Sequence, residues 1–419
     1  MLRSVAALTR LPSSLPSLGR PDNLPPASLA AAAEALTSAR LHRYQHDDPA
    51  ASRVAQLEVA FAALARRRYC CAVNSCGSAM FLALRALEVP QGAPVLVNAH
   101  TLTPVPSAIV HAGARPVLVE ADAMGLADLG DLETKMKSSG AAFLLLSHMR
   151  GRVCDMDEVV RLCGEHGVLL IEDCAHALGS TWAGRPCGEF GAVAVFSCQT
   201  NKLINGGEGG LLVTDMEEVA ARTILMSGSY GHWVTFHPLL PPRELMDSLH
   251  DTTPNFSMRM SELTAAVVTP QLAMLDAKVA KLNRVYRQLE AGIGEIDGVS
   301  VPPRLSKEGL VGSSLQFELG AELAGLSEAT CQEFLDEMQV RGVKVAWFGR
   351  GQWLGFTSTF RHWQYIEGGE ALPKTEQMQR FLIDVPLYHT LTWNRSTSDR
   401  VCDVIKAALS KVFGSTTTQ

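Results

Sequence analysis

The stretch AVAVFSCQTNKLINGGEGGLLVT, residues 192–214, decides most of the fold. Its first part, Ala192–Cys198, is apolar and predicts a buried strand, and Gly210–Thr214 predicts a second one. Between them, Lys202 precedes a glycine-rich loop in which the backbone can approach a ligand closely. Lys202 is either a solvated loop lysine or a lysine held against a flat ligand. In the second setting its amine can form a Schiff base with a carbonyl compound.

Similar apolar runs recur on the N-terminal side of this stretch and alternate with helical patterns. Nearly continuous apolar strands separated by helices predict an α/β protein with a mostly parallel sheet of seven strands, covered by helices. Ligands of such sheets lie beyond the carboxyl ends of the strands. The predicted strands are Tyr69–Asn74, Pro94–Asn98, Pro116–Glu120, Ala142–Ser147, Val168–Glu172, Ala192–Cys198 and Gly210–Thr214.

The pattern changes on the C-terminal side. A long helical pattern starts at Met260, and Pro270 should kink it. Ser314–Glu318 and Val343–Trp347 are typical of strands, and two helices are expected nearby, at Glu328–Val340 and Ser396–Phe413. We therefore expect three parts: an N-terminal extension (1–24), an arm with a large α/β unit (25–285), and a smaller α+β unit (286–419).

The composition is that of an ordinary soluble globular protein and argues against nucleic acid and membrane as partners. The 419 residues are 47% apolar and 19% charged, with a formal net charge of −6. This negative charge and the lack of a Lys/Arg-rich run disfavour a nucleic-acid-binding surface. No uninterrupted apolar stretch is long enough to span a membrane.

The ten cysteines are scattered, and none forms a CxxC pair, so the sequence predicts neither a metal site nor a redox dithiol. Free cysteines indicate a reducing compartment, and we expect the cytoplasm. The first twenty residues contain three arginines, four serines and no acid, a composition that resembles an organelle transit peptide. They are also typical of a short disordered extension, so a mitochondrial or plastid location is the alternative.

Three other predicted strand ends carry residues suited to a ligand site. The first strand ends in Asn74–Ala79 and leads directly into a helix, whose N-terminal N–H groups can bind a phosphate. The second ends near His100, whose ring could face a ligand, although the sequence favours a turn-capping role. The fifth ends at Asp173, which either caps the next turn or pairs with a protonated heteroaromatic nitrogen.

A phosphate cradle, an aspartate and a lysine at one edge of a sheet are the parts that pyridoxal phosphate requires. The phosphate anchors the cofactor, the carboxylate keeps the pyridine nitrogen protonated, and the lysine forms the Schiff base. Their convergence predicts a pyridoxal phosphate site at the carboxyl ends of the strands.

From about Arg43 to Val401, the chain resembles the DegT/DnrJ/StrS family of fold-type-I aminotransferases, which depend on pyridoxal phosphate. Five stretches carry the resemblance, and the third is long and ordered. They are NSCGSAMFLAL, GARPVLVEAD, GVLLIEDCAHALGSTWAGRPCGEFGAVAVFSCQTNKLINGGEGGLLVTD, MRMSELTAA and LPKTEQMQRFLIDVPLYHTLT.

The resemblance implies a role for each matching residue. Lys202 matches the lysine that forms the internal aldimine and moves the proton, and Asp173 matches the aspartate on the pyridine nitrogen. His176 falls beside the ring hydroxyl, and His100 at the aromatic position that stacks on the ring. Phosphate contacts are implied for Ser197 and for the turn Gly77, Ser78 and Ala79.

The resemblance also implies a homodimer with an active site shared between subunits. The cross-subunit residues fall at Ser257, where asparagine is usual, and at Arg259. Other departures are His100 in place of Phe, Trp or Tyr, the helix interruption at Pro270, and a run rich in aromatics and arginine at Trp347–Gln364.

The implied reaction moves an amino group from glutamate or glutamine to a keto-sugar, keto-sugar nucleotide or keto-cyclitol. Two alternatives are an elimination or dehydration that uses the same lysine, and a non-catalytic regulator that binds the cofactor. Family members that dehydrate sugars carry histidine at the lysine position, so Lys202 disfavours that subtype. The presence of both Lys202 and Asp173 disfavours the regulator.

Overall fold

The structure, a computed structural model, describes residues 21–320, 327–366, 371–387 and 393–414. The transit-like segment 1–20 and residues 388–392 of the last family-like stretch lie outside the described residues.

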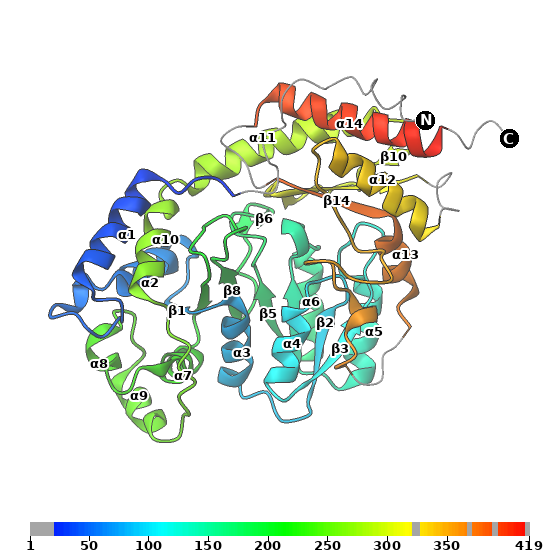
Figure 1. The fold of residues 1–419 in the computed structure, drawn as a ribbon. Helices are drawn as coiled ribbons and strands as arrows, with labels where there is room; N and C mark the ends of the chain where they lie inside the picture. The colour runs from blue at the N-terminus through cyan, green and yellow to red at the C-terminus, as the bar shows by residue number, and fades with distance from the viewer. Residues whose placement is uncertain (1–20, 321–326, 367–370, 388–392, 415–419) are drawn as a thin grey trace.

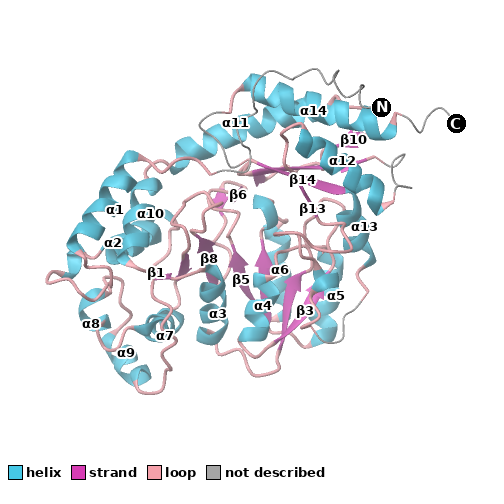
Figure 2. Cartoon of the chain, viewed as in Figure 1, coloured by secondary structure: helices cyan, strands magenta, loops and turns pink. Residues whose placement is uncertain are grey.

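The centre of the fold is a seven-stranded sheet formed by the seven predicted strands (Figures 1 and 2). Its order is β1-β9-β8-β5-β4-β2-β3, and every pairing is parallel except the two that β9 makes with β1 and β8. The prediction of a mostly parallel sheet is therefore confirmed. The bounds are β1 Tyr69–Val73, β2 Pro94–Asn98, β3 Arg115–Val119, β4 Phe143–Ser147, β5 Leu169–Asp173, β8 Val193–Ser197 and β9 Gly210–Thr214.

Helices cover both faces of this sheet, because successive side chains of each strand point to opposite faces. In β2, Val95 and Val97 join the buried cluster under α3, α4 and α7, whereas Leu96 joins the cluster under α2, α5, α6 and α10. This burial on both faces explains the uninterrupted apolar runs. The bounds are α2 Arg53–Leu64, α3 Cys76–Ala86, α4 Pro104–His111, α5 Leu129–Ser139, α6 Met156–His166, α7 Glu217–Gly228 and α10 Glu262–Leu272.

A buried ion pair ties the N-terminal arm to the large sheet. The arm begins with α1 (Pro26–Ser38), which packs against α10. After it, Arg43 donates to both carboxylate oxygens of Glu58 at 2.8 and 2.9 Å, and each residue is 1% exposed. Glu58 also accepts the N–H of Ala72 in β1, and Arg43 donates to the carbonyl of Phe236.

We expect Arg43→Met to lower the free energy of unfolding by about 3–5 kcal/mol, because it leaves the Glu58 carboxylate buried without its cation. Urea unfolding monitored by circular dichroism measures this change. In Arg43→Met/Glu58→Gln, which removes the unpaired charge and keeps an acceptor for Ala72, part of the loss should be regained. If the double variant is as unstable as the sum of the single ones, uncompensated charge is not the cause.

A second, four-stranded antiparallel sheet of order β10-β12-β14-β13 forms beside the large one, with α11 to α14 around it (Figure 1). Three strands differ from expectation: β13 is only Ala346–Trp347, and neither β10 nor β14, Leu382–Pro386, was predicted as a strand. The other bounds are β10 Val299–Ser300, β12 Ser314–Leu319, α11 Leu275–Gly294, α12 Glu328–Val340, α13 Pro373–Phe381 and α14 Arg395–Phe413.

The helical pattern from Met260 forms two helices. Pro270 lies inside α10, and the interruption follows at Ala273 and Met274, before α11 begins. The predicted boundary between residues 285 and 286 falls within α11, which packs against both α14 and β12. The division into parts 1–24, 25–285 and 286–419 is therefore kept as a proposal, with α11 as the connection.

Short elements complete the described part of the chain. A small sheet joins β6 and β7 to β11, far apart in sequence. Across the described ranges, every helix is too short or too polar to cross a membrane. The remaining bounds are α8 Trp233–Phe236, α9 Arg243–His250, β6 Thr181–Trp182, β7 Arg185–Pro186 and β11 Glu308–Gly309.

Candidate active site

The candidate site lies where parallel neighbouring strands end. Strands β8, β5, β4 and β2 are adjacent in the sheet, and β1 is separated from β8 only by β9. Because β1 runs parallel to them, its carboxyl end lies at the same edge. The loops that follow these strands carry the predicted site residues, so the topology brings these loops together.

The turn after β1 forms a cradle at the N-terminus of α3. Ser75 caps this helix and accepts the N–H of Ser78 at 3.0 Å. Gly210, opposite Ser197 in the sheet, lies against this turn: a Cβ there would be 2.3 Å from the Ser75 carbonyl oxygen. Only glycine permits this approach. The turn with Gly77, Ser78 and Ala79 and the end of β8 are thus in contact, and the helix N-terminus suits an anion.

Asp173, the last residue of β5, is 3% exposed and held on both carboxylate oxygens. Oδ2 accepts from the hydroxyl of Ser147 at 2.8 Å, and Oδ1 accepts from the N–H of Ala175 at 3.0 Å. Ser147 is fixed in turn by Asn98, which accepts its N–H at 2.9 Å. Burial has the largest effect on the pKa values of Lys202 and of the Cys76 thiol, and the negative charge of Asp173 also acts on both. It partly offsets the lowering of the Lys202 pKa and adds to the rise of the Cys76 pKa. The aspartate, the lysine and the start of α3 therefore share one site.

Lys202 faces His176 across 2.7 Å between Nζ and Nε2. Burial, with a further contribution from the positive charge of Arg150, lowers the pKa of Lys202 from 10.5 to about 8. Burial also lowers the pKa of His176 well below 6.5, which keeps its imidazole neutral. A lysine with this pKa has roughly a quarter of its amines neutral at pH 7.5, enough for nucleophilic chemistry.

We expect the capture of added pyridoxal phosphate by the cofactor-free protein to speed up with pH, with a midpoint near the Lys202 pKa of about 8. The neutral amine is the nucleophile, so the rate follows its fraction. Asp173 raises this pKa, so Asp173→Asn should move the midpoint to lower pH. Stopped-flow absorbance measures both rates, and a wild-type midpoint near 10.5 would contradict the assigned environment.

His100 is 1% exposed and lies beyond the end of β2. Its ring meets Phe348 edge-on, with 5.3 Å between centroids, and Nδ1 lies 3.3 Å from Nε2 of Gln379. Nε2 of His100 is buried and has no hydrogen-bond partner among the described residues. Burial lowers the pKa of His100 to about 3, so the ring is neutral. A neutral imidazole with a free nitrogen is compatible with an aromatic ligand.

Arg150 is a site residue that we did not predict from the sequence. It follows β4 and lines a pocket with Ala175, His176 and Lys202. Its Nη2 lies 2.8 Å from Oδ2 of Asp384 in β14. One weak signal in the sequence is an arginine-glycine pair three residues after the predicted strand Ala142–Ser147, but no pattern indicates Asp384 as the partner of Arg150.

A buried group of His148, Glu172 and Cys174 has side-chain atoms close enough together to hold a metal ion. The Glu172 oxygens, however, already accept the N–H groups of Gly188, Phe190 and Gly191 at 2.7–2.9 Å. Oε2 of Glu172 also lies 3.1 Å from Nε2 of His148. Glu172 therefore acts as an anchor for the loop at residues 188–191.

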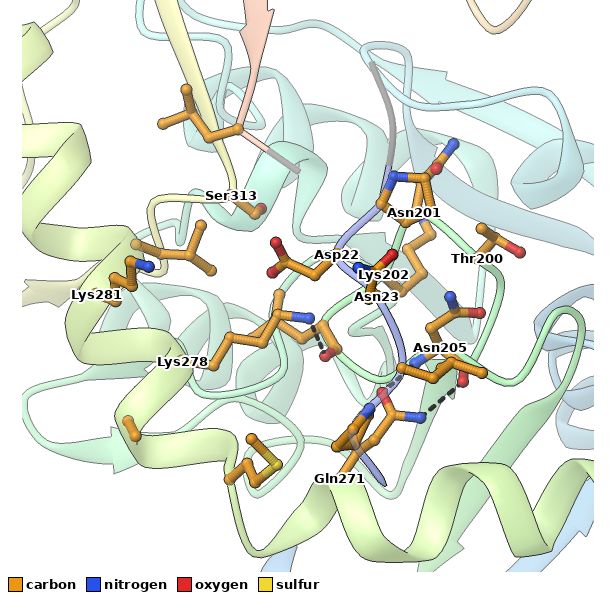
Figure 3. Close-up of a pocket in the computed structure, with 18 of the residues that line it drawn as sticks. Asp22, Asn23, Thr200, Asn201, Lys202, Asn205, Gln271, Lys278, Lys281 and Ser313 are labelled. Atoms are coloured by element: carbon orange, nitrogen blue, oxygen red, sulfur yellow. Dashed lines mark hydrogen bonds between the residues drawn. The ribbon is translucent and has the colours of Figure 1, made fainter. Parts of the chain in front are cut away.

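A larger cavity of about 530 Å³ adjoins the lysine (Figure 3). The N-terminal residues 21–26 form one of its walls, and α11 contributes Lys278 and Lys281. This cavity and the pocket of Arg150 share Asn201, Lys202, Leu203 and Ser313. A ligand in the cavity can therefore reach the lysine amine.

Ser257 and Arg259 lie at the rim of the cradle, beside β1 of the same chain. Arg259 forms a β-bridge with Val73, and its guanidinium donates to the Ser257 hydroxyl at 2.6 Å. Ser257 is exposed and adopts a positive φ of 58°. The structure does not bring these two residues to Lys202, and Arg259 is half-buried, with its guanidinium donating to the carbonyl of Gly228 at 2.9 Å.

Comparison with known proteins agrees with this geometry. The chain is 29% identical to the spore coat polysaccharide biosynthesis protein SpsC of Bacillus subtilis, over 70% of this chain and 71% of that protein. It is 33% identical to the L-glutamine:scyllo-inosose aminotransferase of Streptomyces griseus, over 58% of this chain and 56% of that protein. The crystal structure of 3-amino-5-hydroxybenzoic acid synthase has the same fold, with a TM-score of 0.79 and 24% sequence identity. The match covers 95% of this chain and 100% of that chain.

The family match extends over nearly the whole chain. Residues 33–406 match the sequence profile of the DegT/DnrJ/EryC1/StrS aminotransferase family. This range includes every predicted site residue, and it confirms the resemblance and the fold-type-I architecture. The chain belongs to the DegT/DnrJ/EryC1/StrS family of aminotransferases, which are enzymes that depend on pyridoxal phosphate.

Proposed function

We propose that this protein transfers an amino group from glutamate or glutamine to the ketone of a sugar, a sugar nucleotide or a cyclitol. The observation that carries the proposal is the Lys202 amine, which has a pKa of about 8 and lies in one site with Asp173 and the start of α3. The printed name of the Streptomyces griseus relative supports both the glutamine donor and a cyclitol ketone as acceptor.

The residues of the site fit pyridoxal phosphate. The N–H groups at the start of α3, with Gly77, Ser78, Ala79 and Ser197, would hold the phosphate. His100, whose ring is neutral because burial lowers its pKa, would offer the face of that ring for stacking on an aromatic ring. The chemistry of the donor set also matches, because it combines a carboxylate, a nucleophilic amine and an anion site.

When bound, the cofactor supplies a pyridine ring that accepts electrons from the substrate α-carbon. Asp173 would hold the ring nitrogen in its protonated state, since a nearby negative charge favours the charged form of a base. Hydrogen bonds from the Ser147 hydroxyl and the N–H of Ala175 fix the orientation of the carboxylate. His176, neutral and 2.7 Å from the lysine, would orient Nζ of Lys202 and face the ring hydroxyl.

Lys202 would act twice in the cycle. Its neutral amine would hold the cofactor covalently. Nζ would take the proton from the donor α-carbon in the first half-reaction and would supply a proton to the acceptor carbon in the second. A lowered pKa suits this role because a general base works best with a pKa near the operating pH. The same site would serve both half-reactions, and the oxo acid formed from the donor would leave before the acceptor binds, which is a ping-pong cycle.

The active protein is proposed to be a homodimer. Ser257 is exposed, and Arg259 lies at the rim of the cradle, over the ring of Tyr230 at 5.4 Å. There they can meet the site of a second copy, as the resemblance implies. A cytoplasmic location is also proposed, and the ten unpaired cysteines support it.

The acceptor class is tested with a panel of keto-sugars, keto-sugar nucleotides and keto-cyclitols, offered with glutamine or glutamate. Mass spectrometry should find at least one aminated acceptor, formed in equal amount to the 2-oxo acid of the donor. A dehydrated acceptor without nitrogen would instead identify an elimination enzyme. Donor turnover with aminated products only from simple 2-oxo acids would contradict the sugar or cyclitol assignment.

A further inference from the structure

Arg150 occupies an unusual backbone position above the site. It adopts φ 59° and ψ 21°, in the left-handed region, and Gly151 follows with φ 80°. A side chain in this region costs free energy and is kept where the surroundings fix it, often at functional sites. Here the turn is wedged tightly: a Cβ on Gly151 would lie 3.0 Å from the carbonyl oxygen of His176.

The guanidinium of Arg150 is buried, charged and incompletely bonded. Its side chain is 7% exposed, and its Nη2 lies 2.8 Å from Oδ2 of Asp384. That contact lacks hydrogen-bond geometry: Nε of Arg150 and Oδ2 of Asp384 are both buried without a hydrogen-bond partner in the described chain. Beyond this, the guanidinium lies over the ring of Phe348, 5.6 Å from its centroid.

Arg152, two residues further on, is a structural arginine in the same segment, and its hydrogen bonds can be compared with those of Arg150. Its side chain is 5% exposed, and it donates to both carboxylate oxygens of Glu308, at 2.8 and 3.3 Å, and to the Pro303 carbonyl. Buried polar groups are normally satisfied in this way. An unpaired Nε alone does not distinguish Arg150, because Nε of the structural arginine Arg43 is also buried without a partner among the described residues. Arg150 differs because its contact with Asp384 lacks the two-point hydrogen bonding of the Arg43 and Arg152 pairs, and because it lines the pocket of Lys202. This combination suits a ligand.

The position of Arg150 in the fold determines which part of a bound molecule its guanidinium can contact. It comes from the end of β4, whereas the anion cradle follows β1, on the far side of β5 and β8 in the sheet. The lysine from β8 lies between them, and Arg150 shares a pocket with it. Arg150 is therefore placed to bind a group of the substrate, next to the substrate carbon that reacts at Lys202. The cofactor phosphate would instead lie at the cradle after β1.

From this geometry, and resting on the proposed function, we propose that Arg150 binds the α-carboxylate of the amino-acid donor. The planar guanidinium matches a carboxylate with paired N–H donors. Glutamate and glutamine share this carboxylate, so Arg150 recognises the donor class rather than one amino acid. Asp384 and Ser314, which donates its hydroxyl to Asp384, act as positioning residues that hold the guanidinium before the donor arrives.

Equilibrium binding of 2-methylglutamate to the cofactor-loaded protein tests this assignment. This compound has no α-hydrogen, so it binds without turnover and its Kd follows from the absorbance change. We expect Arg150→Lys to raise this Kd about 10-fold and Arg150→Gln about 100-fold, the range for loss of a charge-assisted pair. The same change at the neighbouring structural arginine, Arg152→Lys, should leave the Kd within about twofold.

The α-amide of 2-methylglutamate is the matched ligand control. Wild type should prefer the acid, and Arg150→Gln should bind both ligands with nearly equal Kd, because only the acid uses the guanidinium. Unchanged acid binding in Arg150→Gln, or equal weakening of acid and amide, would overturn the assignment.

Two further outcomes separate this proposal from the proposed function. If Arg150→Gln fails to retain the cofactor while the Arg150→Lys protein binds the acid normally, Arg150 belongs to the cofactor and the assignment is wrong. If wild type binds 2-methylglutamate through Arg150 but glutamate and glutamine never yield an oxo acid, the assignment stands and the proposed transamination fails.

Discussion

Replacing Lys202 with alanine will abolish the absorbance band that wild-type protein shows with pyridoxal phosphate, and will lower turnover by at least about 1,000-fold. The change removes the amine that binds the cofactor and the group that moves the α-proton, and proton transfer alone contributes about 100- to 10,000-fold. Absorbance titration and steady-state assay measure the two losses separately.

The control for this variant is a second lysine of the same cavity. Lys278 also lines the cavity, but its amine donates a hydrogen bond to the carbonyl of Leu203 at 2.8 Å, which holds it away from the role assigned to Lys202. Lys278→Ala should therefore retain the absorbance band. A colourless wild-type protein, or a band that persists in Lys202→Ala and disappears in Lys278→Ala, would contradict the assignment of Lys202.

Asp173→Asn will reduce turnover by about 1,000-fold and will weaken cofactor binding about 10-fold or more. Asparagine keeps the shape: its oxygen can still accept the N–H of Ala175, and its NH2 group can donate to the Ser147 hydroxyl, so the fold is preserved. What is lost is the negative charge that holds the ring nitrogen protonated, and an interaction needed in the transition state lowers turnover more than binding. Dialysis against known cofactor concentrations measures binding, and single-turnover assays measure the rate.

Ser147→Ala separates the charge of Asp173 from its orientation. It removes one hydrogen bond to the carboxylate but leaves the charge, so the loss of turnover should be far smaller, about 10-fold. If Asp173→Asn retains most of the activity, or if Ser147→Ala is as damaging as Asp173→Asn, the role assigned to the charge is wrong.

The large sheet could be predicted from the sequence because its strands are buried on both faces. Each of the seven runs, such as Ala192–Cys198, is apolar over most of its length, with polar residues mainly at its carboxyl end, and helical patterns separate most of them. The convergence of Lys202, Asp173 and the turn at Gly77 follows from the same fact. Parallel strands end at one edge, so residues that follow different strands meet there.

Strand β14 could not be predicted in the same way. Leu382–Pro386 has Asp384 at its centre, and an acid in the middle of a buried run argues against a strand. The reason for Asp384 lies in the fold, where Arg150, 234 positions earlier in the chain, comes within 2.8 Å. No local pattern contains that pairing. For the same reason, the place of Arg150 beside Asp384 and Lys202 could be found only from the structure.

The central claim, that this protein carries out transamination, is tested most directly by one half-reaction. Cofactor-loaded protein is mixed with glutamine or glutamate, without acceptor, and absorbance is followed. We predict that the spectrum changes to that of bound pyridoxamine phosphate, with one equivalent of 2-oxo acid released per site, and that added oxo acid reverses the change. An unchanged cofactor spectrum with every amino acid offered, or release of ammonia while the cofactor stays as pyridoxal phosphate, would contradict the claim.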